Sequence, residues 1–397
     1  MTSINTKMNT QKYILILAFC SLLFSCSKSE LNFEEQVVIT LQEDLIKTAK
    51  SNLKEEPITV TSAYCSRSAG NKNDFYSEGD YWWPDTNNID GPYIRKDGLT
   101  NPGNFTAHRT AMIRFSRIVG NLTSAYIITQ DTVFANAALE HIRAWFITDS
   151  TKMNPNLLYA QAIKGRHTGR GIGIIDAIHF IEVVKSVMIL EKNNLIADSD
   201  LEYTKKWFAD FTNWLTTHEY GLKEKIHPNN HGTCWNMQVA IFAKFTNNDS
   251  ILNSCRDSFK NNILPSQMAV DGSFPLELER TKPYGYSLFN LDAMVMNCVI
   301  LSDENHNLWN YETTDGKSIK KAIEYMSPYV KDKSSWPLEP DVMYWENWPV
   351  AHPSFLFGAI EYENTEWYRL WEENEHNLTV PEVVRNMPIR NPILWLE

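Results

Sequence analysis

Residues 271–301, DGSFPLELERTKPYGYSLFNLDAMVMNCVIL, set a cluster of polar side chains directly against a long apolar run. Arg280, Lys282, Tyr284 and Tyr286 fall within seven residues. The run that follows carries almost no charge, and its length favours a buried helix over a strand. We therefore predict that the cluster lies at the N-terminal mouth of a buried helix, with the proline between its members in the first turn. A guanidinium, an ammonium and two phenols gathered there can neutralise an anion and move a proton.

The rest of the chain is helical in pattern over most of its length. Residues 34–53 show a helical period of apolar side chains, and the period returns from residue 107 onward. The predicted helices in that later part are 107–128, 132–147, 172–192, 199–217, 231–246, 249–262, 286–302 and 316–330. No segment alternates with period two for long enough to predict a strand, and no Rossmann or P-loop signature is present. Repeated helix pairs of this size predict an all-α fold, an α/α toroid in which inner and outer helices alternate.

The composition is that of a globular protein with an aromatic excess and an acidic balance. Aromatic residues make up 12% of the 397 residues and include 13 Trp, and the net charge is -11. Because the protein as a whole repels polyanions, we expect no nucleic-acid partner, and an anionic ligand needs a local basic patch. We expect the protein to be a monomer.

The first 26 residues have the pattern of an export signal. Lys7 and Lys12 supply its positive region, and residues 13–24 supply an apolar run too short to span a membrane. That run ends in LFSC, which resembles a lipobox, the site where a bacterial lipoprotein is cleaved and lipidated on cysteine, here Cys26. We therefore expect an exported lipoprotein in the periplasm or outer membrane of a Gram-negative bacterium, attached to the membrane only through this lipid. A plain secretory signal is the alternative.

Three irregular segments carry basic and aromatic side chains suited to an anionic ligand. Residues 74–105 form a long loop, and loops of that length in a compact protein are usually functional. Residues 157–173 place basic side chains among glycines that let the backbone approach a ligand, although a solvated basic loop explains them equally well. Residues 331–352 carry tryptophans among prolines, and aromatics there either stack on sugar rings or act as buried wedges. The candidate binding residues in these loops are Trp82, Trp83, Arg95, Arg166, His167, Arg170 and Trp345.

An asparagine–histidine pair opens the predicted helix at 231–246. The sequence KIHPNNHGTCW makes Asn229 or Asn230 a natural N-cap and puts His231 in the first turn, where free N–H groups and the helix dipole favour an anion. Such a pair can grip a carboxylate; a capping Asn beside a partly buried His is the alternative. His227 and His231 have i,i+4 spacing, but a proline lies between them and no glutamate base accompanies them. We therefore expect no metal and no cofactor.

Three function classes fit these groups. Glycoside hydrolysis needs two facing carboxylates, and the acids that could be nominated do not differ from ordinary surface acids: Glu277, Glu279, Asp341 and Glu346. β-Elimination from a polyuronate needs the substrate carboxylate neutralised before the C5 proton can leave, and Asn230, His231 and Arg280 could do this. Positive charge next to Tyr286 would lower the pKa of its phenol and prepare a base. The third class is a glycan-binding protein without catalysis.

Four motifs carry a resemblance to a known family: NNHGTCW, ELERTKPYGYSLFNLDA, GRGIGIIDA, and SEGDYWWPD followed by DGPYIRKDGLTNP. Together they resemble the alginate lyase superfamily domain, within it polysaccharide lyase family 38, and more distantly family 5. The match runs from about residue 62 to residue 358. It implies an α/α toroid with a cleft across one face and metal-independent β-elimination. By this resemblance the catalytic residues are Asn230, His231, Arg280 and Tyr286, while Tyr284 is the rival tyrosine and, with Lys282, a substrate-binding candidate.

The resemblance implies a 1,4-linked polyuronate as the substrate. In mannuronate and glucuronate the C5 proton and the C4 oxygen lie on the same face, so one tyrosine can act as base and then protonate the leaving oxygen in a syn elimination. In guluronate they lie on opposite faces, and a second group such as His231 would share the work. We expect alginate, with polymannuronate preferred, and glucuronan is the alternative. The chain divides into a signal at 1–26, a tether and first helix at 27–56, and a catalytic toroid at 57–397.

Overall fold

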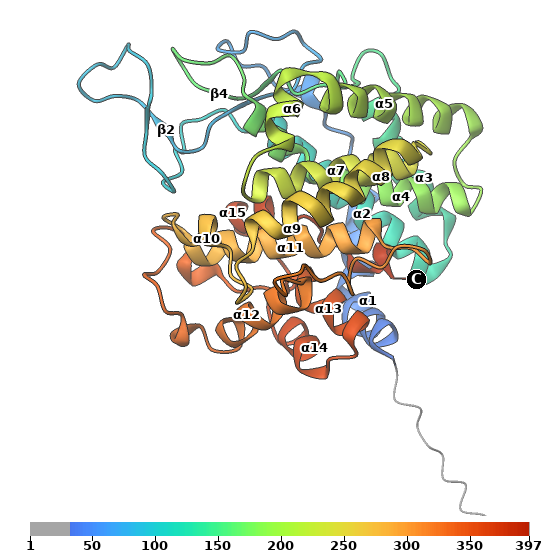
Figure 1. The fold of residues 1–397 in the computed structure, drawn as a ribbon. Coiled ribbons are helices and arrows are strands. Elements are labelled where there is room, and N and C mark those ends of the chain that lie inside the picture. Colours follow the sequence, from blue (N-terminus) through green and yellow to red (C-terminus); the bar gives the residue numbers. More distant parts are fainter. Residues whose placement is uncertain (1–31, 397) are drawn as a thin grey trace, which may run out of the picture.

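The computed structural model describes residues 32–396, and this part of the chain is mostly helical. Figure 1 shows the helices stacked in layers, from α5 (Asp198–Thr217) at one end to α12 (Ile319–Lys331) and α14 (Thr365–Glu372) at the other. Between these ends lie α7 (Asn230–Phe245) and α11 (Pro283–Leu301). Strands within the described residues form two two-stranded ladders and no closed sheet. The prediction of an all-α toroid is confirmed.

The helix predicted from the long apolar run is α11, and it lies inside the helical body. It starts at Pro283, where the missing N–H is harmless because first-turn amides have no helical partner. Every residue of α11 except Val299 is buried, because the helix is apolar around its circumference and packs against α7, α12 and α13 (Pro353–Tyr362). A helix enclosed in this way holds the polar cluster at its N-terminus in a fixed position.

The remaining elements complete the chain order. The other helices are α1 (Phe33–Asn52), α2 (Ala107–Thr129), α3 (Thr132–Phe146), α4 (Phe180–Lys192), α6 (Glu219–Lys225), α8 (Asp249–Ser258), α9 (Leu264–Gln267), α10 (Pro275–Leu278) and α15 (Pro381–Asn386). The strands are β1 (Tyr76–Glu78), β2 (Trp82–Trp83), β3 (Ile94–Arg95) and β4 (Tyr159–Ala162).

The predicted helices are confirmed to within a few residues, with two exceptions. The segment predicted as one helix at 172–192 begins as a 3-10 helix over Gly171–Ala177, and α4 starts only at Phe180. Here the backbone is pressed against β4, since a Cβ on Gly173 would lie 2.5 Å from the Cβ of Ala160. The segment predicted at 249–262 leaves α8 through a π-helical turn over Phe259–Ile263. The short helices α6, α9, α10, α13, α14 and α15 were not predicted.

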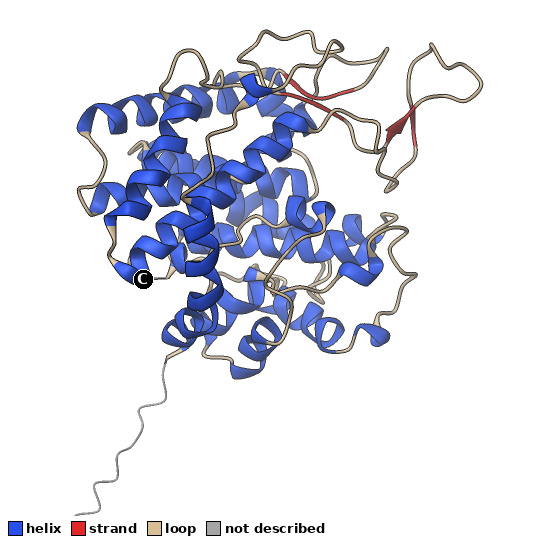
Figure 2. Cartoon of the chain, turned by 180° about the vertical axis from the view of Figure 1, so that it is seen from behind, coloured by secondary structure: helices blue, strands red, loops and turns tan. Residues whose placement is uncertain are grey.

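Short strands fix two of the loops that the sequence predicted as irregular. β1 pairs in parallel with β4, and β2 pairs antiparallel with β3. Figure 2 shows the strands together at one edge of the helical body. They hold the loop at 74–105 beside the loop at 157–173. Each strand has only two to four residues, so no alternation with period two could appear in the sequence.

Some of the expectations about targeting concern residues that the structure does not describe. The predicted signal and the lipidation site Cys26 lie outside the described residues. No helix within residues 32–396 is both long enough and apolar enough to cross a membrane. Cys65, Cys234, Cys255 and Cys298 are buried and free.

Candidate active site

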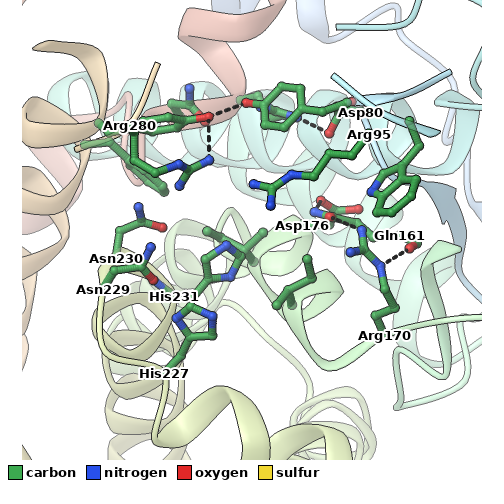
Figure 3. Close-up of a pocket in the computed structure, with 18 residues that line it drawn as sticks. Asp80, Arg95, Gln161, Arg170, Asp176, His227, Asn229, Asn230, His231 and Arg280 are labelled. Carbon is green, nitrogen blue, oxygen red and sulfur yellow. Dashed lines mark hydrogen bonds and ion pairs between the residues drawn. The ribbon is translucent and has the colours of Figure 1, made fainter. Parts of the chain in front are cut away.

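A cavity of about 370 Å³ opens where α7 and α11 begin (Figure 3). Its walls come from five separate parts of the chain: the loop at 74–105, the segment from β4 to the 3-10 helix, the start of α7, the start of α11 with the residues before it, and α15. The lining residues are Asp80, Tyr81, Trp82, Arg95, Gln161, Arg170, Ile172, Ile175, Asp176, His227, Asn229, Asn230, His231, Arg280, Tyr286, Phe289, Arg385 and Asn386.

The start of α7 supplies the asparagine–histidine pair. Asn229 is the N-cap, and its side chain accepts a hydrogen bond from the backbone N–H of His231 at 3.2 Å. Asn230 is largely buried but lines the cavity, and its side-chain Nδ2 lies 2.9 Å from both carboxylate oxygens of Glu277. His231 donates from Nδ1 to Glu224, 2.6 Å away, which leaves Nε2 as its other polar atom. The pair is thus held from behind by two buried carboxylates.

The start of α11 supplies a phenol beside a guanidinium. The hydroxyl of Tyr286 lies 2.6 Å from the hydroxyl of Tyr81 and 3.4 Å from Nη2 of Arg280. The Arg280 guanidinium also stacks over the Tyr286 ring, 4.4 Å from its centroid. Figure 3 shows Arg280 on one side of the cavity, facing Asn230 and His231 on the other. A carboxylate placed between them would meet donors from both α7 and α11.

The expectation that nearby cations lower the pKa of Tyr286 is wrong for this structure. Burial raises the pKa of the phenol, the neighbouring Tyr81 raises it further, and Arg280 opposes both without overcoming them. The pKa of Tyr286 therefore lies well above its ordinary value, and the resting side chain carries its proton.

A buried network of charges holds the loop at 74–105 to the helical body. Arg109 donates to Asp80 at 2.6 and 2.9 Å, and Arg385 pairs with the same carboxylate. Arg385 continues the network to Glu382 at 3.0 Å, and Glu382 pairs with Lys282. Because Tyr81 follows Asp80 directly, this network fixes the position of the tyrosine that touches Tyr286.

Basic and aromatic residues line the side of the cavity that faces the loops. The guanidinium of Arg170 lies over the ring of Trp82, 5.9 Å from its centroid, and donates to the backbone oxygen of Gln161 at 2.8 Å. Burial lowers the pKa of Arg170 to about 10. Arg95 pairs with Asp97 at 2.6 Å, and Asp97 also accepts from Arg280. These groups extend the cationic surface away from the asparagine–histidine pair.

Two residues of the polar cluster do not line the cavity. Tyr284 is fully buried, and its hydroxyl donates to the backbone oxygen of Tyr329 at 3.0 Å. Consecutive helical residues turn by about 100°, so two positions from Tyr286 the side chain faces the core instead of the cavity. Lys282 is buried in its pair with Glu382, and its ammonium lies 5.2 Å from the ring centroid of Tyr286. Both expectations of direct substrate contact are therefore corrected: these residues support the site from within the protein.

Four loop residues predicted to bind the substrate also lie outside the cavity lining. Trp83 donates to the backbone oxygen of Leu99 at 2.9 Å, and Trp345 packs against Tyr284 with ring centroids 5.3 Å apart. His167 closes a tight backbone turn with Ile163, and Arg166 donates to the backbone oxygen of Tyr93 at 2.8 Å. Arg166 still lies near the site, since its guanidinium is 5.4 Å from the ring of Trp82.

The carboxylates nominated for glycoside hydrolysis do not face each other across the cavity. None of Glu277, Glu279, Asp341 and Glu346 lines it. Asp341 instead accepts hydrogen bonds from the first backbone N–H groups of α11, at 2.9 and 3.0 Å. Asp80 and Asp176 do line the cavity, but Arg109 contacts both of them. No pair free for acid and base roles is present among the carboxylates that line the cavity.

Several lining residues were not predicted. Tyr81 lies in the motif SEGDYWWPD, but no pattern there distinguishes it from the adjacent tryptophans. No pattern in the sequence around Gln161 or Asp176 indicates a functional role for either residue. Arg385 and Asn386 belong to α15, a helix that no periodicity or motif in the sequence predicted. Within residues 32–396, no group of three or more His, Cys, Asp or Glu side chains is arranged to hold a metal ion.

Comparisons with known proteins agree with this architecture. The sequence profile described as alginate lyase matches residues 59–336. A crystal structure of an alginate lyase from Bacteroides ovatus aligns with a TM-score of 0.77 and 28% identity, over 92% of this chain and 97% of that one. A variant of alginate lyase A1-III in complex with a tetrasaccharide aligns with a TM-score of 0.59 and 13% identity, over 92% and 94% of the two chains.

Alginate lyase A1-III from Sphingomonas species A1 aligns with a TM-score of 0.50 and 13% identity, over 81% and 88% of the two chains, a similarity of fold alone. A comparison with curated protein sequences gave no significant match. The profile covers more than half of the sequence and includes the starts of α7 and α11. The chain therefore belongs to the alginate lyase family and is a polysaccharide lyase.

Proposed function

We propose that this enzyme cleaves alginate, with polymannuronate preferred, by a syn β-elimination that leaves a 4,5-unsaturated uronate at the new end. The observation that carries the proposal is the convergence of Tyr286, Arg280 and the Asn230–His231 pair on one cavity. The solved structure from Bacteroides ovatus is described as an alginate lyase, which supports alginate as the substrate class.

The first task of the site is to neutralise the uronate carboxylate. The C5 proton is a very weak acid until that charge is compensated, because its removal creates a dianionic enediolate. Arg280 supplies a full positive charge, and Asn230 and His231 supply polar groups from the opposite wall. Donors already aimed at the developing charge need no reorganisation during the reaction, and for this reason they are usually the largest catalytic contribution.

Tyr286 is the proposed base and acid. Its phenolate takes the C5 proton, the electron pair forms the C4=C5 double bond, and the C4–O bond breaks. The phenol then gives the same proton to the leaving oxygen, so the phenolate is regenerated. Because burial raises the pKa of Tyr286 in the resting enzyme, the proposal includes loss of the phenolic proton before the first turnover. That proton leaves to solvent, and Tyr81, whose hydroxyl is 2.6 Å away, can donate a hydrogen bond to the phenolate that remains.

Two points of substrate choice belong to the proposal. Mannuronate and glucuronate present the same reacting geometry, so glucuronan is the alternative substrate with the same mechanism. Guluronate would need a second group on the opposite face, and Nε2 of His231 is the candidate for that role.

The test compares Tyr286→Phe with Tyr284→Phe on polymannuronate, polyguluronate and glucuronan. The readout is the ultraviolet absorbance of the double bond conjugated to the carboxylate. We expect Tyr286→Phe to abolish the signal and Tyr284→Phe to keep it, since the Tyr284 hydroxyl bonds only a backbone oxygen in the core. An active Tyr286→Phe would overturn the proposed base. New reducing ends without absorbance would instead indicate hydrolysis.

We also propose that the protein is an exported, monomeric lipoprotein anchored through Cys26, in the periplasm or outer membrane of a Gram-negative bacterium. The sequence around Cys26 supports this proposal. Cys26→Ala should abolish the attachment of fatty acid to the protein in the producing cell. Fatty-acid labelling that persists in this variant would contradict the anchor.

A further inference from the structure

The side chain of Glu277 touches the active site only through Asn230. Glu277 lies in α10, is 1% exposed and does not line the cavity. Its Oε1 accepts from the backbone N–H of Asn230 at 2.8 Å, and both of its oxygens lie 2.9 Å from Nδ2 of Asn230. Among the described residues no other side chain donates to this carboxylate at a hydrogen-bond distance.

This geometry requires two acceptor atoms. Nδ2 of Asn230 is a donor and lies equally close to both oxygens, so each of them has to accept. A glutamine at position 277 would set its own NH2 group against that donor. Turning the Asn230 amide over would not help, because its oxygen would then face the glutamine oxygen. A protonated carboxyl group creates the same conflict, so the contact selects the ionised form of Glu277.

The burial of the Glu277 carboxylate, taken alone, is unfavourable for folding. Burial raises the pKa of Glu277, and the hydrogen bonds from Asn230, together with the charges of Arg280 and His231, only partly offset this. A buried carboxylate without a cation at hydrogen-bond distance is costly, and a residue that provides only stability would not be built in this way. The ionised carboxylate therefore has its use in the orientation of Asn230.

We propose that Glu277 is a positioning residue for the lyase reaction. Its carboxylate fixes the Asn230 amide in one rotation, in which one N–H is shared between the two carboxylate oxygens and the other N–H is left for the uronate carboxylate. The inference rests on the proposed function, because it assumes that Asn230 binds the carboxylate of the substrate.

The test uses Glu277→Gln beside the matched control Glu279→Gln. Glu279 is exposed, lies two residues after Glu277 and does not line the cavity. We expect Glu277→Gln to lower kcat/KM by about 10- to 100-fold, the effect of leaving buried donors unpaired. Its melting temperature should stay near that of the wild type, because removal of a buried charge offsets the loss of one acceptor for Asn230. Glu279→Gln should keep wild-type activity. A Glu277→Gln protein that loses activity together with its melting temperature would overturn the positioning role.

A double-mutant cycle tests whether Glu277 affects activity through Asn230. In an Asn230→Ala background, Glu277→Gln should change kcat/KM by less than about twofold, because the residue that it positions is gone. Glu224→Gln, which removes the other buried carboxylate, should keep its effect in the same background, since Glu224 contacts His231 instead. An equal effect of Glu277→Gln in both backgrounds would refute the proposal.

The pH dependence gives an independent readout. Protonation of Glu277 should release Asn230, so wild-type activity should fall more steeply toward acid pH than that of Glu277→Gln. The outcomes also separate the two proposals. No absorbance change from the wild type on any of the three polymers refutes the proposed function, whereas an active wild type with a fully active Glu277→Gln refutes only this inference.

Discussion

Asp80→Asn would measure how strongly the buried charge network holds the active-site loop. Asp80 is 5% exposed, and both of its oxygens accept hydrogen bonds from Arg109, while Arg385 pairs with the same carboxylate. Burial alone would raise the pKa of Asp80, but the attraction of Arg109 and Arg385 outweighs it and holds the pKa well below its ordinary value. The asparagine variant removes the anion that two buried guanidinium groups share.

The expected loss in the free energy of unfolding depends on the ion pairs that Arg109 and Arg385 keep in the variant. Breaking a buried ion pair by removing one partner costs about 3–5 kcal/mol. Arg109 retains Asp176 at 3.5 Å, and Arg385 retains Glu382 at 3.0 Å. Neither cation is left fully unpaired, so we expect a loss at the lower end, about 3 kcal/mol in the free energy of unfolding. Activity should fall as well, because Tyr81 follows Asp80 in the chain.

The sign of the pH dependence adds a second check. The pKa of Asp80 is lower in the folded state than in the unfolded state, where it is near 3.9. The stability that Asp80 contributes is thus fully present above pH 3.9 and is lost as the pH falls through the folded-state pKa. The difference between wild type and Asp80→Asn should be complete at neutral pH and shrink in strong acid.

Urea unfolding followed by tryptophan fluorescence is the assay, with Asp90→Asn as the control. Asp90 is an exposed aspartate of the same loop with no ion pair in the described structure. If the unfolding free energy of Asp80→Asn lies within about 0.5 kcal/mol of that of Asp90→Asn, the network does not hold the loop and the reasoning fails.

Three further predictions concern pH and metal. Lyase activity should rise as the pH increases into the alkaline range, because the raised pKa of Tyr286 leaves little phenolate at neutral pH; a pH profile of kcat with an acid optimum would contradict this. Burial raises the pKa of Asp341 to about 6, above its unfolded value, so the protein should lose stability as the pH rises from about 4 to about 6. Asp341→Asn should show less of this loss in thermal melts at both pH values, and an unchanged dependence would show that other groups cause it. Chelator should leave the activity intact, because Arg280, Asn230 and His231 are assigned to the carboxylate; full loss that added metal reverses would overturn that assignment.

Local patterns made much of the fold and part of the site predictable. Helical periods predicted most long helices, and the polar cluster before an apolar run predicted where α11 begins. Capping preferences, which depend only on neighbouring residues, predicted an N-cap at Asn229 or Asn230 and His231 in the first turn, and the structure has Asn229 as the cap. The short C-terminal helices were missed because they span only six to ten residues, too few for a period to be evident.

The sequence by itself determined the helical class of this protein, the starts of α7 and α11, and the residue types that meet there, because periodicity and capping act over a few neighbouring residues. The family resemblance preferred Tyr286 to Tyr284, but only the tertiary structure shows which of the two faces the cavity, since that depends on how α11 is rotated against its neighbours. It also brought in Tyr81, Glu277 and Arg385, which lie far apart in the chain. It reversed the expected direction of the Tyr286 pKa as well, because the cost of burying a phenolate is set by the whole surrounding volume and outweighs one adjacent cation.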